Sequence, residues 1–177
     1  ALVGGAFCLS ALAAMALGAL RIPGALVAFA AIGGLFALFG QVYQSGADPW
    51  QLFALWAALG LPLALAARHD IVWVAWTAVV FAAIPLWGTT MGAHHTGEGQ
   101  QVVGVMWLLG YAVAGALLWL GQRPGAEGTT RWAFRLAIVL TLGMVTTFGA
   151  TAIISHWVSL LFPLAVLLLI GMVHIFL

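Results

Sequence analysis

The sequence predicts an all-α membrane protein, a polytopic bundle of about seven helices that cross a lipid bilayer. Hydrophobic residues make up 65% of the 177 positions and charged residues only 5%. A soluble domain carries about a quarter charged residues, because its surface must be hydrated. The apolar stretches lack the period-two alternation of strands, so helices are the spanning element that this pattern favours.

Seven stretches are long enough to cross the membrane, which takes roughly 20 mostly apolar residues. Cutting the chain at polar or turn-forming clusters places them at about 1–20, 24–42, 49–67, 71–91, 101–121, 132–154 and 157–177. We interpret residues 1–177 as a single transmembrane bundle. Both ends lie inside apolar runs and no initiator Met is present, so we expect the sequence to be a segment of a longer chain.

The connections justify each cut in order. The first stretch ends before the Arg-Ile-Pro cluster at 21–23, and the second ends in the polar run at 44–48. Asp48 and Pro49 are typical of a helix start, as N-cap and first helical residue, so the third stretch begins there. It ends before the Arg-His-Asp cluster at 68–70, and the fourth ends in the glycine-rich segment 92–100.

The last two stretches are divided on length. The fifth stretch ends in the polar segment 122–131. The apolar sequence that follows, from Trp132 to Leu177, is too long for one crossing. We therefore expect a turn at Ser155 and His156, the polar pair near its middle.

The arginines are distributed asymmetrically. All of them lie in the odd-numbered connections or one turn beyond, at Arg21, Arg68, Arg123, Arg131 and Arg135. Cytoplasmic connections carry the excess of Lys and Arg in membrane proteins. We therefore expect the arginine connections in the cytoplasm, and the connections with Asp48 and with His94 and His95 at the outer face.

Composition excludes several classes of function. The chain has no Lys, and a net charge of +1 gives no electrostatic footprint for nucleic acid. The single Cys8 excludes an intramolecular disulfide and a thiolate metal cluster. We expect no cofactor, and the partners that the composition predicts are membrane lipids and other membrane subunits or further copies of this chain.

The polar run at 40–48 is the most distinctive segment of the chain. Gln41, Tyr43, Gln44 and Asp48 cluster at an outer helix end in an otherwise almost polar-free sequence. They form a candidate ligand-binding mouth for a headgroup or a small solute. The structural alternative is that Asp48 caps the third helix while the other three side chains satisfy carbonyls at the interface.

A family resemblance rests on this same segment. The run GQVYQSGADPWQLFALWAALGLPLALAAR, residues 40–68, resembles the hallmark of a bacterial predicted-membrane-protein family, domain of unknown function 2157. The close match covers about residues 25–68. The resemblance implies a multi-pass protein of the bacterial inner membrane, with a cytoplasmic region and a first helix before this point. It supplies no catalytic residues, because the family has no established activity.

The candidate metal ligands are His94, His95 and Glu98. Adjacent histidines in a loop can reach one ion, and a nearby carboxylate can add an oxygen ligand. The alternative is a solvated loop, which the glycines at 92, 97 and 99 favour. His174, within the last apolar run, is a further ionisable candidate at membrane depth.

Two strips of small and polar residues are predicted to face the interior of the bundle. One follows the sixth stretch at Gly143, Thr147 and Thr151, and the other follows the second at 33, 37 and 41. Small residues let helices approach closely, and threonine can bond its own backbone.

These observations leave three hypotheses for the function. The leading one is a non-enzymatic membrane scaffold or a subunit of a larger assembly. The alternative is a carrier or flippase-like protein for a lipid or small amphiphile, with its outer mouth at Gln41–Asp48. The third is a metal-dependent membrane enzyme at His94, His95 and Glu98. No acid lies at bilayer depth, which disfavours conventional coupled transport.

Overall fold

The computed structural model describes residues 21–43, 48–94, 99–124, 129–154 and 166–172, and within these ranges the chain is α-helical with no strand. A short helical segment covers 166–172. The five long helices are α2 (Arg21–Tyr43), α3 (Pro49–Ala67), α4 (Asp70–His94), α5 (Gly99–Gly121) and α6 (Arg131–Ile154). The predicted fold class is confirmed, and α3 begins and ends at the predicted residues.

Four helices, α2 to α5, are long and apolar enough to cross a membrane. Helix α6 has a similar length, 24 residues, but is less apolar and carries two arginines in its first turns, Arg131 and Arg135. The predicted first crossing at 1–20 lies outside the described residues, and only 166–172 of the predicted last crossing are described. The expected count of about seven crossings is therefore not confirmed.

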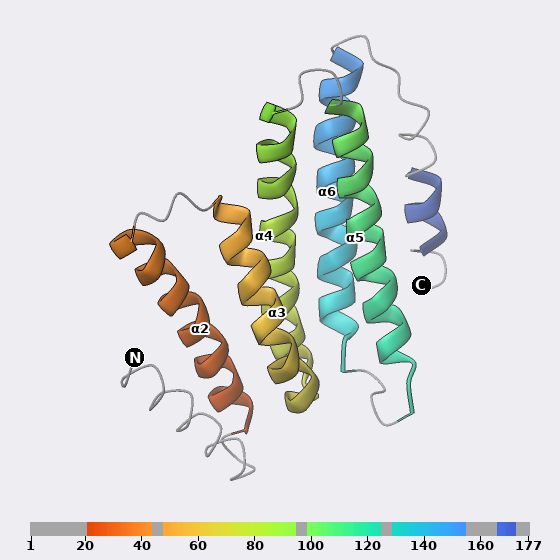
Figure 1. Ribbon diagram of the computed structural model, residues 1–177. Helices are drawn as coiled ribbons and strands as arrows, with labels where there is room; N and C mark the ends of the chain where they lie inside the picture. Colours follow the sequence, from red (N-terminus) through yellow and green to blue (C-terminus); the bar gives the residue numbers. More distant parts are fainter. Residues whose placement is uncertain (1–20, 44–47, 95–98, 125–128, 155–165, 173–177) are drawn as a thin grey trace.

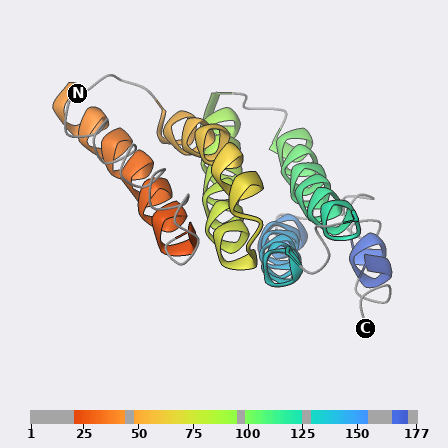
Figure 2. The ribbon, with the colours of Figure 1, turned by 90° about the horizontal axis from the view of Figure 1, so that it is seen from below.

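The helices stand side by side in an up-and-down order. Helices α2, α4 and α6 run in one direction, and α3 and α5 run in the other (Figure 1). Helix α2 lies at one edge and packs chiefly on α3, which packs on α4. Helix α4 also contacts α5 and α6, which pack on each other on the side away from α2, with the segment 166–172 beyond them (Figure 2). Helix α4 is thus the centre of the bundle.

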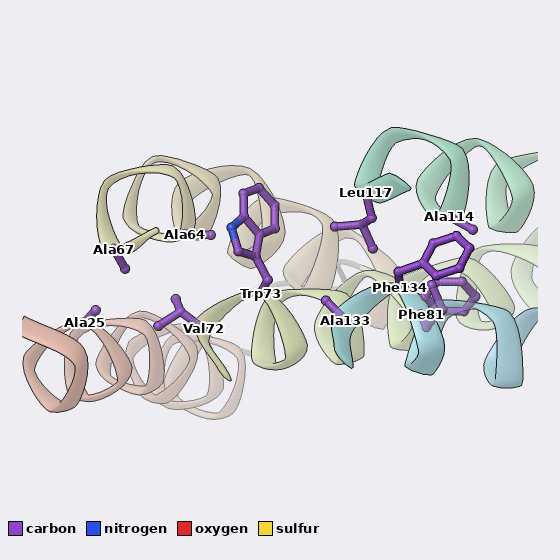
Figure 3. Close-up of a cluster of buried hydrophobic side chains, with 11 residues drawn as sticks. Ala25, Ala64, Ala67, Val72, Trp73, Phe81, Ala114, Leu117, Ala133 and Phe134 are labelled. Carbon is purple, nitrogen blue, oxygen red and sulfur yellow. The ribbon is translucent and has the colours of Figure 1, made fainter. Parts of the chain in front are cut away.

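The core changes in character across the row of helices. Small side chains from α2 and α3, with Val72, form one end of the largest buried cluster (Figure 3). Larger side chains, including Phe81, Leu117 and Phe134, form the other end where α4, α5 and α6 meet. This cluster therefore has small side chains at its α2–α3 end and larger ones at its α4–α6 end.

Helices α2 and α3 interlock through two glycines. A Cβ atom at Gly33 would overlap the indole of Trp56, and a Cβ atom at Gly60 would overlap the ring of Phe29. Each helix thus places an aromatic ring against a glycine of the other, and the two rings lie 5.4 Å apart between centroids. The missing side chains allow the close approach that small residues provide in membrane helix pairs.

Two indole groups join the helices by hydrogen bonds as well. Trp56 donates its Nε1–H to the carbonyl oxygen of Phe29 in α2, at 2.8 Å. Trp76 in α4 donates to the carbonyl oxygen of Ala57 in α3, also at 2.8 Å. The indoles supply polar links from α4 through α3 to α2, in a medium that offers no competing water.

Candidate functional site

Asp48 occupies the predicted position before α3, but its carboxylate makes no capping hydrogen bond. Pro49 follows as the first helical residue and has no N–H to offer. In a side-chain cap, the amide N–H of Gln51 would donate to the carboxylate of Asp48. Here it donates instead to the backbone oxygen of Asp48, at 3.0 Å. The capping position is confirmed, and the expected side-chain bond is wrong.

The rest of the predicted mouth is described only in part. Gln41 is exposed near the end of α2, at the same end of the bundle as Asp48 (Figure 1). Tyr43 is the last residue of α2, and its side chain lies outside the described residues, as does Gln44. The four residues as a ligand-binding set stay a prediction.

Sequence reasoning missed a polar group beside Asp48. The indole Nε1 of Trp50 is buried and has no hydrogen-bond partner within the described ranges. Buried indole N–H groups normally find an acceptor, because an unpaired one loses its hydration without compensation. The sequence feature that could have indicated this group is the position of the tryptophan, two residues after Asp48.

The predicted metal ligands fall at the end of α4 and beyond it. His94 is the last residue of α4, and its side chain lies outside the described residues together with His95 and Glu98. Within the described ranges no group of three or more His, Cys, Asp or Glu side chains could hold a metal ion. The metal site therefore stays a prediction.

All five arginines lie at one end of the bundle, where α2, α4 and α6 begin and α3 and α5 end (Figure 1). We call this the arginine end. Gln41 and Asp48, two residues of the predicted mouth, lie at the opposite end. The separation of the two groups in space follows from the alternation of helix direction, and the side of the membrane on which each group lies stays a prediction.

A carboxylate from α4 caps α6 at the arginine end. The two oxygens of Asp70 accept the amide N–H groups of Trp132 and Ala133, at 2.7 and 3.1 Å. These are amides of the first turn of α6, which lack intrahelical acceptors. Asp70 is also the first residue of α4, so its charge lies near the positive ends of two helix dipoles.

Other helix ends at the arginine end are also satisfied by neighbouring helices. The hydroxyl of Thr130, just before α6, donates to the carbonyl oxygen of Leu117 in α5 at 2.8 Å. A guanidinium nitrogen of Arg21 donates to the carbonyl oxygen of Ala66 in the last turn of α3. These bonds, with those of Asp70, connect α2 to α3, α4 to α6 and α6 to α5 at this end.

Two arginines stack on tryptophan rings at the arginine end. The guanidinium carbon of Arg123 lies 3.7 Å from the ring centroid of Trp119. That of Arg135 lies 4.8 Å from the ring centroid of Trp132. Both distances are within the range of cation–π attraction.

The predicted interior strip on α6 is wrong for its described residues. A Cβ atom placed at Gly143 would meet nothing within 4 Å, and Thr147 is exposed. The hydroxyl of Thr147 donates to the carbonyl oxygen of Gly143 at 2.7 Å, which confirms the interpretation that threonine bonds its own helix. On α2, Gly33 packs inward, whereas Ala37 and Gln41 are exposed.

Comparison with known proteins finds a family match for the N-terminal part of the chain. Residues 1–73 match the model of a family described as predicted membrane protein, DUF2157. The match spans α2, α3 and the start of α4, and includes the polar run at 40–48. The predicted resemblance is confirmed over residues 1–73, and the description of the family gives a membrane protein and no activity. No curated protein and no solved structure matches the chain.

Proposed function

We propose that this membrane protein, whose first 73 residues match the DUF2157 family, is a non-enzymatic scaffold or a subunit of a larger membrane assembly. One observation carries the proposal: polar chemistry inside the bundle is sparse. The buried polar residues of the described ranges are Thr77, Thr130 and Thr141, and none of them ionises at physiological pH.

Two of the three buried threonines are engaged by backbone atoms, whereas the hydroxyl of Thr77 has no partner within the described ranges. Thr130 and Thr141 donate to carbonyl oxygens, Thr141 to that of Ala137 at 2.7 Å. The indoles of Trp56 and Trp76 donate to carbonyls of adjacent helices. A proton- or ion-coupled carrier usually needs an ionisable group or broken helix at depth. Polar side chains that bond one helix to another support a scaffold role, in which the protein's function is to hold helices in a fixed arrangement.

The outward surface offers room for partner helices. Helix α6 exposes a stripe of residues at helical spacing, with small or hydroxyl-bearing side chains in its second half: Val139, Leu142, Gly143, Thr146, Thr147 and Ala150. Close contact between membrane helices is favoured where side chains are small. We propose that this stripe associates with a membrane helix of a second copy or of another subunit.

The proposed location is the bacterial inner membrane, with the arginine end in the cytoplasm. The support is the positive-inside rule together with the common end that the five arginines share. Asp48 then lies at the outer face.

The scaffold proposal is tested by the assembly state of the purified protein in a mild detergent. We expect a stable oligomer or a stoichiometric complex by light scattering coupled to size-exclusion chromatography. Gly143→Leu should shift it toward the monomer, because the larger side chain blocks close approach. Gly115→Leu is the matched control, since a Cβ there also meets nothing within 4 Å. A monomeric wild-type protein without a partner would contradict the proposal.

A second candidate function, a carrier with its mouth at Gln41–Asp48, is favoured by two polar groups. The carboxylate of Asp48 is not used as a cap, and the buried indole N–H of Trp50 has no partner within the described ranges. In proteoliposomes the carrier would accelerate transbilayer movement of a fluorescent phospholipid, and Asp48→Asn would slow it. A rate equal to that of protein-free vesicles would exclude this function for that lipid.

A further inference from the structure

We infer that the two arginine–tryptophan pairs at the arginine end are binding sites for the headgroups of anionic phospholipids. The pairs are Arg123 on Trp119, at the end of α5, and Arg135 on Trp132, at the start of α6. The inference does not depend on the scaffold role, because lipid binding is compatible with either proposed function.

Both tryptophan rings lie outside the described protein core. Trp119 is 57% exposed and Trp132 is 64% exposed, although both belong to long, largely apolar helices. Indole rings in this position prefer the level of the lipid headgroups, with the ring body against the upper acyl chains. The guanidinium group stacked on each ring is therefore held at the depth of the phosphate groups.

Among the residues that the structure describes, neither guanidinium group is paired with a carboxylate. Within the described ranges, Asp70 is the acidic residue at this end, and both its carboxylate oxygens accept amides of α6. Its bonds to α6 also occupy the helix-start amides that could otherwise hold a phosphate. An anion that approaches the start of α6 would then meet side-chain guanidinium groups rather than backbone N–H groups.

Guanidinium geometry matches a phosphodiester well. The planar group can give two parallel N–H bonds to phosphate oxygens while its face stays on the indole. Stacking also fixes the side chain in advance, which reduces the rotamer entropy lost on binding. A zwitterionic headgroup brings its own cation and gains less from the same contact. The pairs should therefore prefer phosphatidylglycerol to phosphatidylcholine.

Native mass spectrometry of the detergent-purified protein, titrated with phosphatidylglycerol or phosphatidylcholine, tests the inference. We expect the wild-type protein to retain phosphatidylglycerol preferentially. The double variant Arg123→Gln, Arg135→Gln should lose about fivefold in affinity for each arginine removed. Addition of inorganic phosphate should not compete, which distinguishes a lipid site from a site for the free anion.

The control removes the same charge from the same end. Arg68 and Arg131 are exposed arginines for which no ring contact is seen in the described ranges. The double variant Arg68→Gln, Arg131→Gln should keep most of the lipid preference. Equal retention of the two lipids by the wild-type protein would overturn the inference. An equal loss in both double variants would also overturn it, because net charge rather than the stacked pairs would then explain binding.

Discussion

At the scale of single residues, the carboxylate of Asp70 joins two helices of the described structure. Asp70 begins α4 and caps α6 through two amides that lie 62 and 63 positions further along the chain. The residue next to α6 that would normally provide the cap, Thr130, directs its hydroxyl to α5 instead. Capping of α6 is thus a tertiary contact, and its loss should loosen the contact between α4 and α6.

We expect Asp70→Ala to destabilise the protein by about 1–2 kcal/mol, the usual cost of removing an N-cap acceptor. Asp70→Asn should cost less, because the amide oxygen can still accept one N–H group. The measurement is thermal unfolding in mild detergent, followed by tryptophan fluorescence. Asp48→Ala is the control, since that carboxylate makes no capping bond to α3. Equal destabilisation by both alanine variants would refute the role of Asp70.

The residue scale was also where the sequence was least informative. It indicated that Asp48 would cap a helix, which is a local pattern of an acid before a proline. It could not indicate that Asp70 caps α6, because that bond depends on how α4 and α6 approach each other. The buried indole N–H of Trp50, which has no partner among the described residues, could not be predicted for the same reason, since burial of one atom is set by packing.

At the scale of elements, the contact between α2 and α3 depends on the absence of side chains at two positions. The rings of Phe29 and Trp56 occupy the space that side chains at Gly60 and Gly33 would need. Gly34 is adjacent in sequence but lies on the other side of α2, where a Cβ meets nothing within 4 Å. Neighbouring glycines in one helix therefore have opposite packing requirements.

We expect Gly33→Ala to cost about 1–3 kcal/mol, because the new methyl group overlaps the Trp56 indole and forces the helices apart. Gly34→Ala should stabilise the protein by about 0.5–1 kcal/mol, since alanine is the better helix former and nothing obstructs it. Both variants are compared by thermal unfolding under one detergent condition. If Gly33→Ala proved as stable as Gly34→Ala, the interlock would not hold α2 to α3.

Helix positions were well predicted and helix faces were not. The ends of the helices follow from polar clusters and prolines, so α3 was placed to the residue and the other four to within three residues. The faces could not be read in the same way, because these helices are apolar all round. Both Gly33 and Gly143 were expected to pack inward, and the expectation is correct for Gly33 and wrong for Gly143. Small residues mark positions where another helix can pack closely. They do not indicate whether a helix of the described bundle packs there.

At the scale of the whole molecule, alternation of helix direction collects all the arginines at one end. We expect this end to be cytoplasmic. In a Cys8→Ser background, Gln51→Cys should react with a membrane-impermeant maleimide from outside intact cells. Gln122→Cys, at the arginine end, should react only after the membrane is opened. Both glutamines are exposed and uncharged, so each cysteine variant serves as the control for the other. Labelling of both from the same side would contradict the topology.

The overall architecture was the most predictable level. Composition and segment length identified a helical membrane bundle, and the arginine pattern anticipated which helix ends would lie together. The number of crossings was harder to predict in physical terms, because α6 combines a spanning length with two arginines and several hydroxyl groups. The candidate mouth was predictable as a polar segment, but its internal geometry depends on side chains beyond the described ranges.

The bond between Asp70 and α6 has a consequence for biogenesis. When Asp70 leaves the ribosome, the α6 amides that bond to its carboxylate have not yet been synthesised, because they lie more than sixty residues downstream. Until the sixth helix is inserted, that carboxylate must be hydrated or held by another group. The contact between α4 and α6 at this end can therefore form only after residues 132 and 133 have been synthesised, whereas the bond from Arg21 to Ala66 can join α2 to α3 earlier.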